Sequence, residues 1–369
     1  MPAVAVAGGA NHAPTGPPAG GGGLVPFFYG TNQYVEKFAS VTTTFGAAQS
    51  ESVFNVNPGG FMRGVRLEVR SISGVLGTGA VAADGPWTAM PSATLENIDG
   101  SPLQYPMSAY AYMTKQWFAR PWWGDPSKRF DFSNTINPSF SMFLQPEIRH
   151  TAGVLANTDA RALYRVRFTL NSLTGFLGTV GTATTPTVTV TCYLESWAQP
   201  DKEDLRGNMI EELPPGINLA TLTRHQVINL SAVGADNTWQ VSNMGNEIRC
   251  FIWIMRNSSG VRTDLASTPV RWRIDNRSLG VFGTEEIFNR MADFYVSLQN
   301  GSVRPTGVYV WPRFFDPGRM VGEAWLSTNN ATYTIWETAT AAGGAGGTIE
   351  IITDEVVPVG PVPMEFESI

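Results

Sequence analysis

Apolar and polar residues alternate with a period of two along much of the chain. In VRLEVR, the apolar residues Val65, Leu67 and Val69 alternate with charged residues. The same alternation recurs in RALYRVRFTL (161–170) and, later in the chain, in TPVRWRID (268–275) and GTIEII (347–352). Successive side chains of a strand point to opposite faces, so this pattern predicts half-buried antiparallel strands. Because Gly, Pro, Asn and Asp separate these segments, we expect an all-β chain of sandwiches or barrels.

Two segments have a helical pattern instead. The stronger is GTEEIFNRMADFYVSLQNG (283–301), in which Thr284 is a good N-cap and two glutamates follow at the positive end of the helix dipole. An apolar stripe at helical spacing follows in the same segment. The weaker helix is MSAYAYMTKQWFA (107–119). The sequence therefore predicts two β-sandwich domains, each with a short inserted helix.

A short motif recurs after each predicted helix. PWWGDPSKR (121–129) follows the weaker helix, and PRFFDPGRM (312–320) follows the stronger one. At one common offset, the motif pairs Pro121 with Pro312, Trp123 with Phe314, Asp125 with Asp316, and Pro126 with Pro317. A repeat of this kind indicates two similar halves. The predicted parts are an arm (1–34), a first domain (35–200), a linker (201–216), a second domain (217–357) and a tail (358–369).

The aromatic stretch GVYVWPRFFDPGR (307–319) has two readings. An Asp-Pro pair starts a turn, so the stretch is interpreted as a structural joint wedged between helix and sheet. A ligand-binding cradle is the alternative. The residues assigned to the joint are Pro121, Trp123, Asp125, Pro126, Trp311, Pro312, Phe314, Asp316 and Pro317.

The first 30 residues are mostly Gly, Pro and Ala, which bury little surface and lose much entropy on ordering. We expect a flexible arm with no targeting or membrane-spanning segment. Within LVPFFYG (24–30), the apolar side chains of Leu24, Val25, Phe27 and Phe28 form a candidate anchor. This anchor either docks on a partner or packs back on its own domain.

The composition narrows the function classes. Only 15% of the 369 residues are charged, against roughly 25% in an average soluble chain. A chain so poor in charge is expected to bury much of its outer surface against partners. The net charge of −6 argues against sequence-specific nucleic-acid binding, which usually needs a basic excess.

We find no motif that indicates an enzyme, a cofactor or a metal site. The three histidines lack metal-ligand spacing, and there is no G-x-S-x-G elbow or Walker loop. Cys192 and Cys250 each lie on the apolar face of an alternating segment, so we expect both to be small core residues. The carboxylate pair Asp354–Glu355 is interpreted as solvated surface. We therefore expect no catalytic residues, although Trp122 or Trp123 would suit a carbohydrate-binding module.

Three segments carry a resemblance to a known family. The segment 35–69 has an apolar strand, a Pro-Gly turn and a long strand. TVTCYLESWAQP (189–200) is similar to a last strand before a second roll, and GVYVWPRFF (307–315) follows a helix and precedes terminal strands. Over about residues 35–357 the chain resembles the double jelly-roll major capsid proteins of tectivirus-like bacteriophages, which are tailless and contain an internal membrane.

This resemblance implies two eight-stranded jelly rolls standing side by side. Three chains would form a pseudo-hexameric capsomer, and such capsomers would tile an icosahedral shell around a membrane and genome. The implied partners are the chain itself, neighbouring capsomers, minor capsid or penton proteins, and the internal membrane through the arm. The implied location is the virion capsid, after synthesis in the host cytoplasm without secretion.

The arm departs from the family, whose N-terminal segment is commonly helical. A Gly/Pro-rich segment does not hold a helix, so the manner of membrane contact is left open. The alternative function is a β-sandwich carbohydrate-binding or spike module that binds a receptor.

Overall fold

The computed structural model is dominated by β-strands. It describes residues 24–71, 73–82, 84–119, 138–148, 153–217, 219–232, 234, 236–241, 246–264, 270–274, 277–282, 306–312, 326–327, 334–339 and 346–358.

The first half of the chain forms a sandwich of two antiparallel layers. One layer has the strand order β1 (Gln33–Thr44), β11 (Thr187–Trp197), β3 (Phe61–Ser71) and β7 (Ser139–Leu144), and short β8 (Leu155–Ala156) also pairs with β3. The other has the order β2 (Ser50–Asn55), β9 (Arg165–Leu170), β5 (Ser92–Glu96) and β6 (Pro102–Met107). Because the first and last long strands are neighbours and the chain crosses between the layers, this is a jelly roll.

The second half repeats this topology strand for strand. One layer has the order β12 (Leu219–Asn229), β20 (Thr348–Pro358), β14 (Glu247–Arg256) and β17 (Val308–Pro312), and β18 (Leu326–Ser327) also pairs with β14. The other has the order β13 (Asp236–Val241), β19 (Thr334–Ala339), β15 (Val270–Ile274) and β16 (Arg277–Phe282). The predicted fold class, an all-β double jelly roll, is confirmed.

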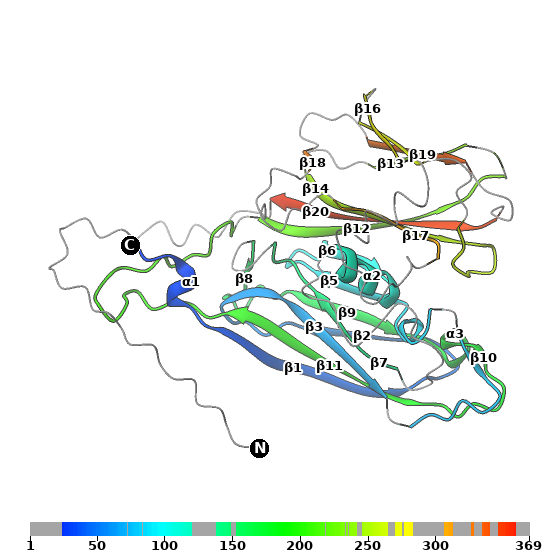
Figure 1. The fold of residues 1–369 in the computed structure, drawn as a ribbon. Coiled ribbons are helices and arrows are strands. Elements are labelled where there is room, and N and C mark those ends of the chain that lie inside the picture. The colour runs from blue at the N-terminus through cyan, green and yellow to red at the C-terminus, as the bar shows by residue number, and fades with distance from the viewer. Residues whose placement is uncertain are drawn as a thin grey trace, which may run out of the picture.

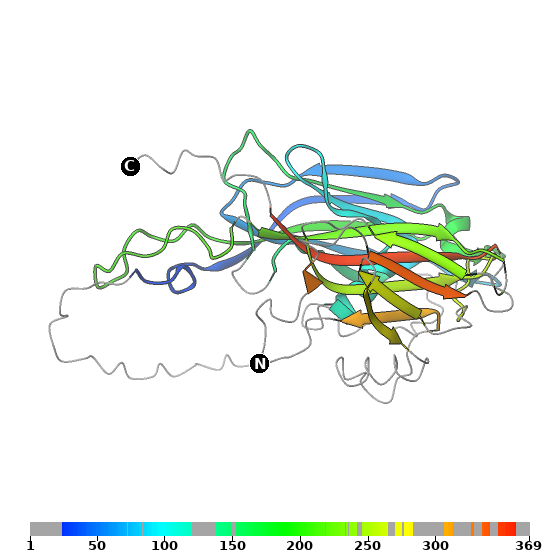
Figure 2. The same cartoon turned by 90° about the horizontal axis from the view of Figure 1, so that it is seen from above.

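A single sheet joins the two rolls. The β6 edge of the first roll pairs in parallel with β12 of the second, with Gln104 opposite Thr223. The layer β2-β9-β5-β6 therefore continues into β12-β20-β14-β17 as one sheet. Figures 1 and 2 show the two rolls packed against each other, with this sheet shared between them.

Short elements close the two ends of the first roll. Helix α1 (Phe27–Gly30) lies at one end, beside the linker (Figure 1). At the opposite end lie α3 (Leu173–Phe176) and the paired strands β4 (Ala80–Val81) and β10 (Leu177–Thr179). The 3₁₀ turn η1 (Trp87–Ala89) follows β4 and contacts α3.

Helix α2 (Ala109–Ala119) is enclosed between the rolls. It contacts β7 and η1 of the first roll, and β14, β17 and β20 of the second. Residues 109–116 are all buried. This burial explains why the segment has a weak amphipathic pattern, because a helix covered on all sides needs no polar face. The predicted helix at 107–119 is thus present, whereas the one predicted at 283–301 lies outside the described residues.

The alternating strands bury the faces that their sequences predict. Val65, Leu67 and Val69 of β3 all face the core of the first roll, and so does Cys192 of β11. Burial raises the pKa of the Cys192 thiol to about 12, so this thiol stays protonated near neutral pH. Both cysteines are buried and free, as small core residues are expected to be.

Strand β14 departs from simple alternation because both of its faces are covered. Cys250, Ile252 and Ile254 join the core around α2. Phe251 and Trp253 alternate with them and are buried too. This strand separates the two rolls, and for that reason its sequence is almost continuously apolar.

The structure corrects the repeat alignment at the aromatic stretch. Residues 308–312 form strand β17, which pairs with β14 and places Trp311 opposite Phe251. This part of the stretch is therefore strand and not a turn. The strand of the first roll in the equivalent place is β7, and Pro121 precedes β7 in the chain, so Pro121 and Pro312 are not equivalent. The halves repeat in topology, but their connecting segments differ in length.

Candidate functional site at the junction of the two rolls

A buried ionic cluster crosses the junction at the centre of α2. The ammonium group of Lys115 donates a hydrogen bond to Oε1 of Gln104 on β6 at 2.7 Å and another to the Thr223 hydroxyl on β12. The same Nζ lies 3.3 Å from Oδ1 of Asp354 on β20. Arg249 of β14 pairs with the other oxygen of Asp354, and its Nε lies 3.0 Å from Oδ2. A buried charge is costly unless it is paired, and here each charge meets its opposite.

Further hydrogen bonds fasten β12 and β14 to the first roll. Thr221 on β12 donates through its hydroxyl to the carbonyl of Gln145 at 2.7 Å and accepts at its own carbonyl from the Gln104 side chain at 3.0 Å. Arg249 also donates from Nη1 to the carbonyl of Ile148 at 3.0 Å. The polar side chains of the junction therefore fix one relative position of the two rolls.

A second ionic cluster crosses the junction near β4. Asp84 of the first roll accepts from Arg256 of β14 and from Nε of Arg262, the latter at 2.7 Å. Arg256 also donates to Oε1 of Glu350 on β20 at 2.8 Å. Both guanidinium groups lie over the ring of Tyr110, with their carbons 5.6 Å and 4.8 Å from the ring centroid. Cation–π attraction therefore adds to the ion pairs.

The environment of this cluster shifts the pKa values of Tyr110 and Glu350, among others. Burial raises the pKa of the Tyr110 hydroxyl well above its usual range. Burial alone would also raise the pKa of the Glu350 carboxyl, but His225 and Arg256 outweigh this effect and hold that pKa below its usual value. The Glu350 carboxylate lies 3.7 Å from Nε2 of His225. Glu350 is therefore ionised at neutral pH and holds Arg256 in place.

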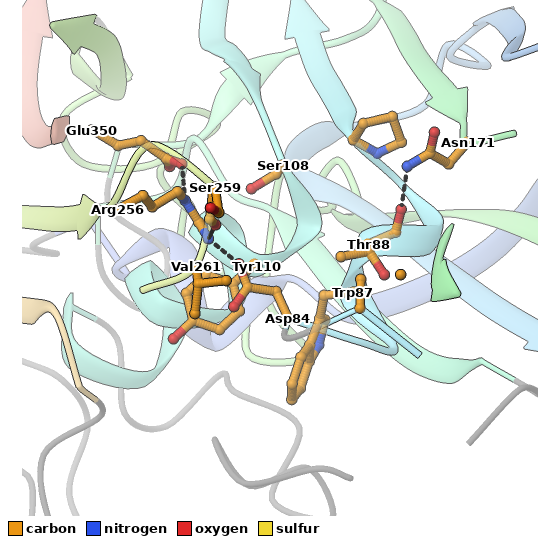
Figure 3. Close-up of a pocket in the computed structure, with 14 residues that line it drawn as sticks. Asp84, Trp87, Thr88, Ser108, Tyr110, Asn171, Arg256, Ser259, Val261 and Glu350 are labelled. Atoms are coloured by element: carbon orange, nitrogen blue, oxygen red, sulfur yellow. Dashed lines mark hydrogen bonds and ion pairs between the residues drawn. The ribbon is translucent and has the colours of Figure 1, made fainter. Parts of the chain in front are cut away.

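A pocket of about 440 Å³ opens beside this second cluster (Figure 3). The first roll supplies one wall, which includes Thr88, Ser108 and Asn171. The second roll supplies Arg256 and Glu350, and the exposed turn 259–261 lies at the edge of the pocket. Since Gly178 of β10 also lines it, the pocket lies toward the end of the molecule opposite α1 (Figure 1).

The predicted arm anchor divides into buried and exposed residues. Phe27 is fully buried and meets Phe61 edge to face at 5.3 Å between ring centroids. Val25 is half-buried, and its backbone bonds to residues 209 and 211 of the linker at 2.8 Å. Leu24 and Phe28 are 59% and 47% exposed. Part of this segment thus packs on its own chain, and part of it faces outward.

The residues assigned to the structural joint are mostly outside the described residues. Trp311 and Pro312 end strand β17. The other seven, together with Trp122, lie in segments that the structure does not describe. The joint reading therefore stays a prediction for them.

Sequence reasoning missed the ionic residues of the junction. The interpretation of Asp354 and Glu355 as solvated surface is wrong, because both residues lie inside β20 and are about 1% exposed or less. A usable signal was present, because Lys115, Arg249 and Asp354 each lie in an element in which most residues are apolar. Charged residues inside buried elements indicate partners of opposite charge.

The geometry also bears on metal binding and on membrane crossing by helices. Within the described ranges, no group of three or more His, Cys, Asp or Glu side chains is placed to hold a metal ion. In the same part of the chain, every helix is too short or too polar to cross a membrane.

Comparisons with known proteins identify solved structures that have a similar fold. Neither a protein-family model nor a curated protein sequence matches the chain. The STIV major capsid protein, from Sulfolobus Turreted Icosahedral Virus, superposes with a TM-score of 0.61 at 11% identity, over 92% of this chain and 100% of that one. The chain has the double jelly-roll fold of viral major capsid proteins.

Two further double jelly rolls are similar to this one. The PBCV-1 virus capsid protein gives a TM-score of 0.56 at 12% identity, over 88% of this chain and 94% of that chain. The major capsid protein P2 of bacteriophage PM2 gives 0.52 at 8% identity, over 89% and 98%. Each double jelly roll is matched along nearly its whole length, so the likeness includes both rolls and their relative placement.

Proposed function

We propose that this chain is a structural major capsid protein that trimerises into pseudo-hexameric capsomers. The capsomers tile an icosahedral shell around an internal membrane and genome. The observation that carries the proposal is the strand-for-strand equivalence of the two rolls. Three copies in a ring present six similar rolls, so a trimer can occupy a six-fold position in a closed lattice.

The junction supports this role mechanically. A capsomer keeps its outline only if the two rolls of each chain do not move against one another. The shared sheet and the ion pairs of Lys115 and Asp84 oppose such movement. Breaking a buried pair is strongly unfavourable, so the two rolls act as one block.

The low charge of the chain supports extensive contacts between subunits. Taking charged groups out of water is costly, so a surface with few of them is easier to bury. Residues 35–200 and 217–357 remain the proposed limits of the two rolls. The proposed location is the virion shell, after synthesis in the host cytoplasm, and the proposed partners beyond the trimer are neighbouring capsomers and minor capsid or penton proteins.

The arm supports a contact on the inner side of the shell. Its last residues, Leu24 and Phe28, are exposed and apolar, whereas Phe27 holds the segment to the body. Apolar side chains beside an uncharged, Gly/Pro-rich arm suit insertion at a lipid surface. We place the internal membrane at this end of the molecule.

Light scattering after size exclusion tests the oligomer. The expected mass is three times the 40.0 kDa of one chain, with hexagonal outlines in negative stain. A monomer at every concentration, without particles, would contradict the capsid proposal.

Truncation tests the membrane contact separately. Deleting residues 1–23 leaves Phe27 in place, so we expect a folded trimer that floats less with phospholipid vesicles than the full chain does. Deleting residues 1–30 also removes Phe27 and serves as the comparison for loss of the anchor. Unchanged flotation of both truncated chains would contradict a membrane role for the arm.

A further inference from the structure

The pocket between the rolls has unused hydrogen-bonding capacity. Nη2 of Arg256 and the hydroxyl of Ser259 have no hydrogen-bond partner among the described residues, whereas Nε and Nη1 of Arg256 hold Glu350 and Asp84. The Ser108 hydroxyl accepts from the amide of Ala111 at 3.2 Å, which leaves its own hydrogen to donate. The pocket thus offers both donors and acceptors.

The charges beside the pocket cancel. Two carboxylates, those of Asp84 and Glu350, face two guanidinium groups, those of Arg256 and Arg262. A free anion or cation would have to break one of these pairs to bind strongly. A neutral ligand does not incur that cost.

The opposite wall is neutral and fixed. Asn171 donates from Nδ2 to the carbonyl of Thr88 at 2.9 Å, and Thr88 donates its hydroxyl to the carbonyl of Phe176 at 3.2 Å. Figure 3 shows these two residues facing the charged wall across the pocket, with Ser108 between them. Pro91 and the half-exposed Val261 add apolar surface. The volume of the pocket, about 440 Å³, lies in the usual range of roughly 300–1,000 Å³ for small-molecule sites.

We propose that the pocket between the rolls binds a neutral sugar residue. A sugar carries many hydroxyl groups that both donate and accept, together with apolar C–H faces, and it has no charge. These properties match a charge-balanced wall, a wall of hydroxyl and amide groups, and a small apolar edge. Because both rolls contribute walls, the bound sugar stabilises the junction. This inference concerns the single chain and does not depend on capsid assembly.

The test is binding of monosaccharides to the full chain, measured by calorimetry and thermal melts. Glucose, galactose and N-acetylglucosamine are the neutral probes, and glucuronate and glucosamine are the charged ones. At least one neutral sugar is expected to raise the melting temperature, because a ligand bound only by the folded state stabilises that state. Glucuronate and glucosamine are expected to bind more weakly than the neutral sugar of matching shape.

Two variants place the binding in the pocket. Ser259→Trp fills the edge of the pocket, and we expect it to raise the dissociation constant at least about tenfold. Ser258→Trp is the matched control, since Ser258 is exposed and does not line the pocket, and binding should be retained. No binding of any neutral probe, tighter binding of a charged one, or equal binding by both variants would overturn the proposal.

Discussion

Lys115 of α2 and Asp354 of β20 meet at 3.3 Å between Nζ and Oδ1, although they are 239 positions apart in the chain and belong to different rolls. Both side chains are almost completely buried. This contact is the centre of the ionic cluster that holds the rolls together, and it leads to the first prediction.

Replacing Lys115 with Met should destabilise the chain strongly. The change removes one of the two donors to Oε1 of Gln104, the other being the Thr223 hydroxyl, and it removes one of the two cations beside Asp354. Loss of one partner from a buried pair typically costs about 3–5 kcal/mol. Urea unfolding measures the change. Lys37→Met, at an exposed position of β1, is the control and should alter stability by less than about 0.5 kcal/mol. Equal midpoints for the two variants would show that the cluster does not hold the rolls.

The pH dependence of stability should have opposite signs at two glutamates of β20, Glu350 and Glu355. The folded-state pKa of Glu350 is lowered, so its contribution is present above the unfolded pKa and is lost as the pH falls through the folded value. Burial raises the pKa of Glu355 despite the hydrogen bonds it accepts, so its protonated form is favoured by folding.

Melting curves of Glu350→Gln and Glu355→Gln between pH 7 and pH 3 test this difference. The stability gap between the wild type and Glu350→Gln should shrink as the pH falls below about 4. For Glu355→Gln, the wild type should gain relative to the variant as the pH falls. Parallel curves for the two variants would mean that local partners do not set these pKa values.

The attachment of residues 24–32 to the body of the protein should depend on the ring of Phe27. Phe27→Ala removes a fully buried ring from the contact with Phe61. Truncation of a fully buried aromatic ring typically lowers the free energy of unfolding by about 3–5 kcal/mol. We expect local release of residues 24–32, detected by faster amide hydrogen exchange and new proteolytic cleavage there. Phe28→Ala is the matched control because Phe28 is 47% exposed, and it should leave exchange unchanged. Identical exchange in both variants would count against Phe27 as the anchor.

The joint reading of residues 307–319 can be tested at Trp311. If the stretch is structural, Trp311→Ala should lower the free energy of unfolding by about 3–5 kcal/mol. If the stretch is an exposed cradle, the loss should stay within about 0.5 kcal/mol. Thermal melts of wild type and variant decide between these outcomes. An unchanged melting temperature with intact trimers would favour the cradle.

The sequence predicted the fold where one face of a strand meets the core and the other meets water. Strand β9 is such a case, since Val166 and Phe168 are buried while Arg165 and Arg167 are partly exposed. Alternation carries less information in β14 and β20, because both faces of these strands are covered.

The junction site could not be predicted for a related reason. The partner of Lys115 is a strand from the far end of the chain, and nothing local to α2 indicates which carboxylate it meets. The repeat alignment went wrong because jelly rolls conserve strand order rather than spacing, so a fixed offset does not identify equivalent residues.

The position of β20 has a consequence for how the chain is made. All strands of the first roll precede residue 198, so this roll can fold while the rest is still being synthesised. Helix α2 then lacks its contact with β20, and Lys115 has no carboxylate from that strand, until the last described strand emerges and inserts between β12 and β14. A chain that stops before residue 348 therefore leaves β12 and β14 without the strand that lies between them, and leaves Lys115 without Asp354. We therefore expect a chain truncated before β20 to be cleaved by proteases more readily than the full chain, because its central sheet is open.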